Sequence, residues 1–218
     1  MNFRAVALPL LIVCGVRAQL LSPGIKVGAR LTDDVGGFSL LNPESKRSIV
    51  GPTLDLKLPF HFGVEVDALY RTFGYSSEFG GLGTFSYSFQ RERSNSWEFP
   101  VIGKFRIPLH CFHPFVGAGF NSRTVKGTTT ASGGYSTSLS TLPYTFFSAR
   151  QKTNYPVTHG LVVSGGIEFR FKHLRLAPEF RYQRWNRLFL EQYGGDGSYE
   201  LFSPQNEAFI MIGLSWRK

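Results

Sequence analysis

The stretch FGVEVDALYR, residues 62–71, alternates apolar and polar side chains with a period of two. Its even-numbered residues are Phe62, Val64, Val66, Ala68 and Tyr70, and its odd-numbered charged residues are Glu65, Asp67 and Arg71. Successive side chains of a β-strand point to opposite faces of the sheet. The stretch therefore predicts a strand with one apolar face and one charged face.

Seven further runs with the same alternation lie before and after this one. The eight runs fall within residues 25–31, 53–60, 62–71, 97–107, 114–124, 161–171, 174–183 and 208–216. Runs of about ten residues have the length that a tilted strand needs to cross the hydrocarbon core of a membrane. The sequence therefore predicts an all-β chain with eight antiparallel strands.

The connections between these runs alternate between long and short. Short connections lie at His61, at residues 109–113 and at residues 172–173, and the other four are long. This rhythm places four long loops at one end of an up-and-down barrel, as in outer-membrane barrels. The segment GTTTASGGYSTSLST, residues 127–141, has 12 Gly, Ser or Thr among 15 residues and is predicted to be a polar, mobile loop.

The faces opposite the apolar sets carry charges of both signs. The basic residues there are Lys26, Arg30, Lys57, Arg71, Lys104, Arg106, Arg123, Arg170, Arg175 and Arg181, and the acidic ones are Asp55, Glu65, Asp67, Glu98, Glu168 and Glu179. An eight-stranded barrel is just wide enough to be filled by side chains, and buried charges must be paired. We therefore expect a lumen plugged by ion pairs. The candidates for these pairs are Asp55, Glu65, Asp67, Arg71, Glu98, Lys104, Arg106, Glu168, Arg170, Arg175, Glu179 and Arg181.

The apolar faces are predicted to contact lipid. Their one charged exception is Arg184. Aromatic residues gather at both strand ends, as in the interfacial girdles of membrane barrels. They are Phe60, Phe62, Phe171 and Trp216 at one end and Tyr70, Trp97 and Tyr182 at the other. The alternative is a soluble lipocalin-like barrel in which the apolar faces point inward. Such a barrel needs neither aromatic residues at both strand ends nor long loops at one end only. The Gly-x-Trp motif at the start of lipocalins is also missing.

Residues 1–18 have the features of a secretory signal peptide. Arg4 supplies a positive start, residues 5–16 form a twelve-residue apolar stretch, and Ala18 provides the small residue before the cut. The apolar stretch is too short to span a bilayer as a helix. We expect cleavage after Ala18 and a barrel domain over residues 19–218. A lipoprotein signal around Cys14 is the alternative, but the bulky Val13 precedes that cysteine.

Composition excludes several other classes. The chain has 24 Lys and Arg against 15 Asp and Glu, but no basic run or basic helix, so nucleic-acid binding is not expected. Beyond the leader, Cys111 is the only cysteine, and a single cysteine cannot form an internal disulfide. His110, Cys111 and His113 make a poor tetrahedral metal set and are interpreted as a polar turn. We expect no metal and no other cofactor.

Four segments resemble a known family. SWEFPVIGKFRI followed by HPFVGAGF, and the closing EAFIMIGLSW with the preceding LRLAPEFRYQRW, are similar to the outer-membrane protein β-barrel domain family of OmpA-like and PorT-like small barrels. The resemblance implies outer-membrane lipid and the barrel-assembly machinery as partners. The family usually ends on its aromatic residue, whereas Arg217 and Lys218 follow Trp216 here. We expect no peptidoglycan-binding domain after the barrel.

The sequence favours a non-enzymatic, monomeric outer-membrane barrel that is structural or binds an extracellular ligand through its long loops. A lipid-modifying deacylase or acyltransferase barrel is one alternative, for which His159 with Ser122 or Ser148 is the candidate pairing. No neighbouring acid is evident, and no catalytic residue is assigned. A small channel is the other alternative.

Overall fold

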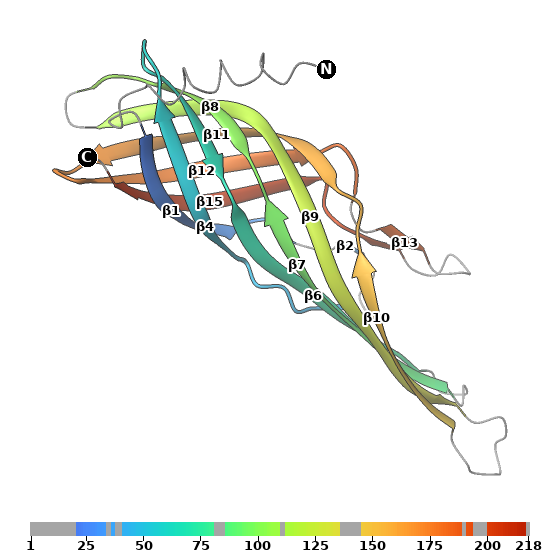
Figure 1. Cartoon of the computed structure of the whole chain (residues 1–218). Coiled ribbons are helices and arrows are strands. Elements are labelled where there is room, and N and C mark those ends of the chain that lie inside the picture. Colours follow the sequence, from blue (N-terminus) through green and yellow to red (C-terminus); the bar gives the residue numbers. More distant parts are fainter. Residues whose placement is uncertain are drawn as a thin grey trace, which may run out of the picture.

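The computed structural model describes residues 21–33, 36–37, 41–80, 86–109, 112–135, 145–188, 191–193 and 200–216. Eight strands form the wall of a barrel (Figure 1). They are β1 (Leu21–Arg30), β4 (Ser48–Lys57), β5 (Phe62–Asp67), β8 (Val101–Arg106), β9 (His113–Tyr135), β11 (Thr158–Arg170), β12 (Leu174–Trp185) and β15 (Asn206–Trp216). The predicted leader and its cleavage site lie outside the described residues.

The barrel is closed because the first and last wall strands pair with each other. The ring runs β1–β4–β5–β8–β9–β11–β12–β15 and returns to β1. Every neighbouring pair is antiparallel. Closure leaves no unpaired edge in the wall, so its backbone polar groups are satisfied internally. The predicted fold class, an eight-stranded antiparallel barrel, is confirmed.

The alternation in the sequence sets the two faces of this wall. In β15 the even-numbered residues Ile210, Ile212 and Leu214 are exposed on the outside, whereas Phe209 and Met211 are buried inside. The same pattern holds along β1 and β4. The outside of the barrel is therefore apolar. The alternate residues of each strand point into the barrel.

Tight turns join the strands at the end of the barrel that carries Trp216. The first one, Pro59–Phe62, is closed by a hydrogen bond from Phe62 N to Pro59 O of 3.3 Å. Its central residues Phe60 and His61 have φ angles of 59° and 66°. Positive φ at both central positions is the requirement of a type I′ turn, which joins paired strands without splaying them. Two non-glycine residues therefore occupy a strained backbone region.

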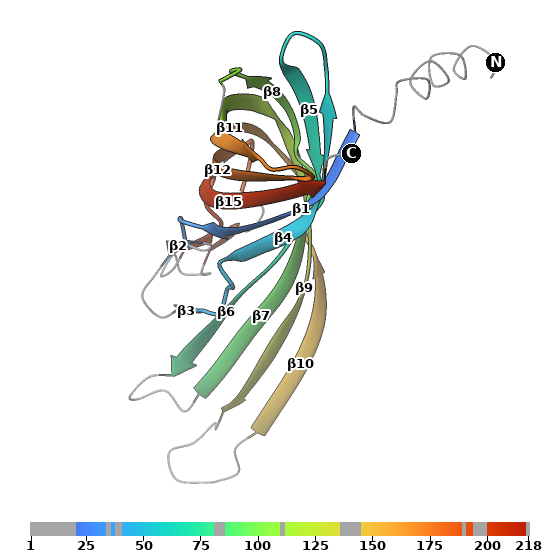
Figure 2. The same ribbon diagram turned by 90° about the vertical axis from the view of Figure 1, so that its left-hand side faces the viewer.

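Four strands continue beyond the barrel as one long sheet, which we call the arm (Figure 2). The arm consists of β6 (Leu69–Gly80), β7 (Ser86–Glu98), the second half of β9 and β10 (Thr145–Asn154), in the order β6–β7–β9–β10. β6 continues β5, and β7 precedes β8 with a break at Phe99 and Pro100. Pro100 has no amide hydrogen, so the ladder is interrupted where wall and arm meet.

The arm corrects one expectation from the sequence. Residues 127–135, predicted as the start of a mobile loop, are paired on both sides, with β7 and with β10. Backbone hydrogen bonds form a ladder whatever the side chains are, and Thr is well suited to strands. Residues 136–141 of that segment lie outside the described residues, as do His110 and Cys111.

Short elements complete the fold. β3 (Leu41–Pro43) pairs with β6, and β2 (Gly36–Gly37), β13 (Glu191–Tyr193) and β14 (Glu200–Phe202) make a small separate sheet. In the described part of the chain, no helix has both the length and the apolar character needed to cross a membrane.

Candidate functional site

The lumen contains three layers of ion pairs along the barrel. The layer nearest the tight turns joins Arg106 and Arg175 to Asp55 and Glu168. Arg106 donates from Nη2 to Asp55 Oδ2 at 2.6 Å and from Nε to Glu168 Oε1 at 2.7 Å. Arg175 pairs with the same two carboxylates, 3.5 Å from Glu168. Two cations thus share two carboxylates, and all four side chains are buried.

The middle layer has three cations and three carboxylates. Its members, all buried, are Lys26, Lys104, Arg181, Glu65, Asp67 and Glu179. Lys104 Nζ lies 2.7 Å from Glu65, and Lys26 Nζ lies 3.0 Å from Glu179. Arg181 Nη2 lies 2.9 Å from Asp67 Oδ2 and also contacts Glu65 and Glu179. Each cation touches at least two carboxylates, so this layer is balanced in charge.

The third layer, nearest the arm, centres on Glu207. Arg71 donates from Nη2 to both carboxylate oxygens of Glu207, at 2.9 and 3.1 Å, and its Nε lies 2.9 Å from Glu98. Arg123 Nη1 lies 3.1 Å from the same Glu207. Arg30 is also buried at this end of the lumen. Such charge-assisted hydrogen bonds are roughly twice as strong as those between neutral groups.

Aromatic rings inside the barrel contact the cations. The Arg123 guanidinium lies 3.9 Å from the centre of the Trp185 ring, and Lys104 Nζ lies 4.2 Å from that of Phe115. Cation–π contacts of this kind favour a desolvated cation. Ile49, Leu69, Phe209 and Met211 form a buried apolar cluster in the same interior. Paired charges and apolar side chains together fill the inside of the barrel.

One glycine shows how tightly the lumen is packed. A Cβ added at Gly63 would lie 2.2 Å from Nη1 of Arg106 and 3.0 Å from the backbone oxygen of Leu56. Heavy atoms cannot approach that closely. Glycine at this position therefore makes room for the arginine that holds Asp55 and Glu168.

Eleven of the twelve ion-pair candidates are buried in the three layers. Arg170 is the exception: its side chain is 29% exposed at the turn end and lies 3.6 Å from Glu168. Lys26, Arg123 and Glu207 also take part in these layers but are not among the twelve candidates. Lys26 and Arg123 belong to the predicted inward basic set. Glu207 lies one residue before the eighth run, on the same inward face as Phe209 and Met211, so its position is predictable from that alternation.

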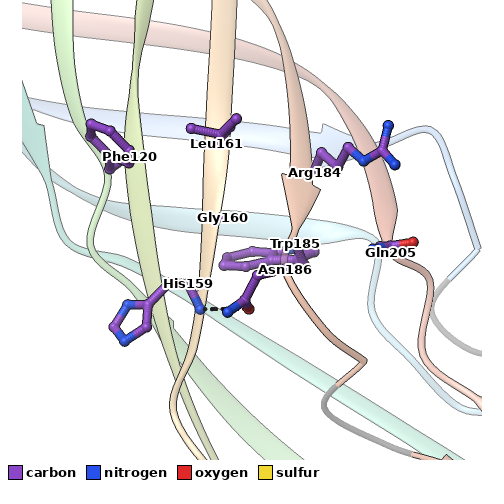
Figure 3. A pocket seen from close by; sticks show the side chains of 8 residues that line it. All are labelled: Phe120, His159, Gly160, Leu161, Arg184, Trp185, Asn186 and Gln205. Atoms are coloured by element: carbon purple, nitrogen blue, oxygen red, sulfur yellow. Dashed lines mark hydrogen bonds between the residues drawn. The ribbon is translucent and has the colours of Figure 1, made fainter.

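A pocket of about 330 Å³ lies at the arm end of the wall, between β9, β11 and β12 (Figure 3). It is lined by Phe120, His159, Gly160, Leu161, Arg184, Trp185, Asn186 and Gln205. The backbone N–H of His159 donates to Asn186 Oδ1 at 3.3 Å, and the imidazole points away from Asn186. The lining is mostly apolar.

This pocket does not assemble the catalytic pairing considered from the sequence. His159 and Ser122 are cross-strand partners on β11 and β9, but Ser148 lies in the arm opposite Ser132. Within the described part of the chain, the imidazole of His159 makes no hydrogen bond or ion pair. A hydrolytic site needs a nucleophile bonded to a base that a third group orients. The geometry therefore gives the enzyme alternative no support.

A second buried polar cluster lies on the inward face of the arm, around Glu92 of β7, which pairs in register with Tyr75 of β6 and Thr129 of β9. The carboxylate of Glu92 accepts hydrogen bonds from Tyr155, from Ser94 at 3.0 Å, from Tyr75 at 3.1 Å and from Thr129 at 3.3 Å. Burial, together with the Glu92 carboxylate, raises the pKa of the Tyr155 phenol, which therefore stays a donor. This cluster ties β6, β7 and β9 to the segment between β10 and β11.

The outward face of the arm is cationic. A groove of about 570 Å³ there is lined by Phe89, Arg91, Arg93, Asn95, Thr128, Thr130, Ser132 and Arg150. Glu44 accepts a hydrogen bond from Arg91 Nε at 2.7 Å, and that bond lowers the pKa of the Glu44 carboxyl. This face is the candidate binding site that the sequence did not predict, because residues 127–135 were expected to form a loop.

No family model matches the chain, and no curated protein matches it in sequence. Among solved structures it is similar to Neisserial surface protein A, at 8% identity over 91% of this chain and 96% of that one, with a TM-score of 0.49. The N-terminal barrel domain of Pseudomonas aeruginosa OprF matches at 9% identity over 92% and 98%, with a TM-score of 0.43. The outer-membrane protease OmpT of Escherichia coli matches at 9% identity over 92% and 94%, with a TM-score of 0.39. These likenesses concern the fold alone.

Proposed function

We propose that the chain is a non-enzymatic, integral outer-membrane barrel protein whose lumen is closed by ion pairs and whose arm carries its binding specificity. The observation that carries this proposal is the inverted distribution of side chains. Charges are buried inside the barrel, whereas Val27, Val66, Val163 and Ile212 are exposed on its outside. A soluble barrel gains stability from the reverse arrangement.

The ends of the apolar outer surface support the same proposal. Tyr70 and Trp97 are in contact, with ring centres 5.2 Å apart, at the arm end of the wall. Phe62 and Phe105 lie 5.2 Å apart at the turn end, where Trp216 is also exposed. Aromatic rings at both limits of an apolar band are typical of membrane barrels.

Outer-membrane lipid is the partner that this surface implies. We further propose that the barrel is a monomer and that the cell's barrel-assembly machinery inserts it after removal of residues 1–18. The closed wall supports the monomer, because a ring with every strand paired needs no second chain to complete it.

Fractionation tests the location. The full chain is expressed in a bacterium with two membranes, which are separated by density. We expect the protein in the outer membrane, beginning at Gln19. Folded protein in a detergent-free soluble fraction would contradict the proposal.

Two assays on purified protein test the alternatives. We expect no release of fatty acid from phospholipid or from glycolipid, and no difference in the His159→Ala variant. In planar bilayers we expect no stepwise conductance. Release that His159→Ala abolishes would establish the enzyme instead, and steady ion steps would establish the channel.

A further inference from the structure

Five cationic side chains lie on the outward face of the arm, in register across three strands. They are Arg91 and Arg93 on β7, Lys126 on β9, and Arg150 and Lys152 on β10. The pairing places Arg93, Thr128 and Lys152 in one row across the sheet, and Arg91, Thr130 and Arg150 in the next row. Each row thus has a threonine on the central strand with a cation on either side.

The spacing of these rows suits a phosphate group. Neighbouring strands lie about 4.8 Å apart, so the two cations of a row originate roughly 10 Å apart with a hydroxyl group between them. An anionic oxygen above the threonine is within reach of a long basic side chain from each flank. The groove of about 570 Å³ over these rows is large enough for a phosphorylated sugar.

The charge on this face is unbalanced. Among acidic residues whose side chains the structure describes, Glu44 and Glu78 are those on the outward face of the arm. Glu44 lies 2.6 Å from Arg91 Nη2 and 3.8 Å from Arg93 Nε. Glu78 is paired in register with Phe89, at the far end of the groove. Five cations against two carboxylates leave Lys126, Arg150 and Lys152 exposed to solvent.

The outward face of the arm continues the lipid-facing side of the barrel. Arg93 lies four residues beyond Trp97 on the same face of β7, roughly 13 Å along the strand. Lys126 lies two residues beyond Thr124, the cross-strand partner of Trp97. If Trp97 marks the interface, as the proposed function requires, these cations begin at the height of the lipid headgroups.

We propose that the outward face of the arm binds the phosphate groups of the outer-leaflet glycolipid, between Arg93 and Lys152 in one row and between Arg91 and Arg150 in the next. Thr128 and Thr130 donate hydroxyl groups from the floor of the groove. The inference rests on the proposed outer-membrane location for the source of its ligand. A sulfated polysaccharide outside the cell has similar charge, but the continuity of this face with the apolar outer wall favours a lipid.

The test is a binding assay on the purified full-length protein in detergent. The probes are phosphorylated lipid A, the same lipid without its phosphates, inorganic phosphate and a soluble sulfated polysaccharide. We compare wild type with the double variant Arg93→Gln/Lys152→Gln. The matched control is Arg184→Gln/Arg187→Gln, which removes two exposed cations from the end of β12 and the residues after it.

We expect phosphorylated lipid A to bind more tightly than the dephosphorylated lipid. The arm variant should lose roughly 30-fold in affinity, because each basic residue near an anionic surface contributes roughly a factor of five. The control should lose less than about threefold. Inorganic phosphate should bind weakly and compete only at high concentration. Unchanged thermal unfolding of both variants verifies that each is folded.

Three results would overturn the proposal: equal binding of the two lipids, equal losses in the arm variant and the control, or a larger loss for the polysaccharide than for the lipid. The assay uses purified protein and so does not depend on where the cell places it. A protein that is found in the outer membrane but binds the two lipids equally would therefore contradict this inference alone. Soluble protein in the fractionation contradicts the proposed function.

Discussion

At the scale of single residues, the lumen is stabilised by carboxylates that several cations share. Glu168 is bonded to Arg106 and lies close to Arg175, and it is buried. Removing one partner of a buried ion pair leaves an uncompensated charge, which costs more than the pair contributed. The effect of a substitution therefore depends on which side chains remain.

Replacing Glu168 with Leu should lower the free energy of unfolding by about 3–5 kcal/mol, because Arg106 and Arg175 then share Asp55 alone. Urea unfolding in lipid vesicles, followed by tryptophan fluorescence, measures this loss. The matched control is Glu78→Leu, an exposed carboxylate in the arm, which should cost under about 0.5 kcal/mol. Equal effects of the two substitutions would show that the inward carboxylate is not held as described.

The strained turn gives a prediction of the opposite sign. His61 has a positive φ, which glycine adopts without strain. His61→Gly should therefore stabilise the barrel by about 0.5–1 kcal/mol in the same unfolding measurement.

The control for this turn is Lys172→Gly, in the tight turn between β11 and β12. Lys172 has no positive φ, so glycine there brings only its entropic cost. It should leave stability unchanged or lower it slightly. Equal destabilisation by the two glycine substitutions would contradict the prediction that relieving the positive φ of His61 stabilises the barrel.

Sequence alternation predicts which residues point inward, but not which of them meet. Lys26 and Glu179 are 153 residues apart and become partners only because β1 and β12 both pair with β15. The register of the ring fixes such contacts, and no local pattern encodes it. Glu207 is a simpler case, because it directly precedes the alternating run of residues 208–216 and shares the inward face of Phe209 and Met211.

At the scale of elements, the arm is the part that sequence analysis did not foresee. An apolar face marks a wall strand, but residues 127–135 have Gly, Ser and Thr on both faces. Their strand conformation comes from ladders with β7 and β10, whose own polar sequences carry no clear period. The strands of the arm are therefore identified from their backbone pairing in the structure and not from the sequence pattern.

The hydrogen bonds to Glu92 are expected to stabilise the arm against local opening, because they join β6, β7 and β9 to the segment that leads into β11. Tyr155→Phe removes one donor from a buried carboxylate and should loosen the arm. Hydrogen exchange should become at least tenfold faster at residues 126–135, since losing a hydrogen bond to a charged group costs roughly 1.5–3 kcal/mol. Amides of β12 and β15 should be unaffected.

Tyr87→Phe is the control for this exchange measurement. Tyr87 lies on β7, in the same sheet, but its side chain is exposed. It should leave exchange in the arm unchanged. Acceleration in both variants, or in neither, would remove the stabilising role assigned to Glu92.

At the scale of the whole molecule, eight alternating runs and sorted connections were enough to predict the closed barrel. Closure requires only that each run pairs with its neighbours and that the first meets the last. The charges predict which face of each strand points inward, because a narrow lumen can hold paired ions whereas hydrocarbon cannot. Contact between the apolar outer wall and lipid is the proposed property that a mutation can test most directly.

Val66 lies on the outside of the wall between Leu54 and Val101, and 43% of it is exposed. Val66→Arg should cost about 2–4 kcal/mol in a bilayer, the penalty for arginine near the midplane on the lipid face of a barrel. Phe171→Arg, at an exposed position near the turn end, should cost only about 0–1 kcal/mol. In a water-surrounded barrel both changes affect the surface and should be equally mild. Unfolding of the two variants in vesicles decides between these surroundings: a steep difference with depth is expected, and two small, equal losses would show that the apolar outer wall does not face lipid.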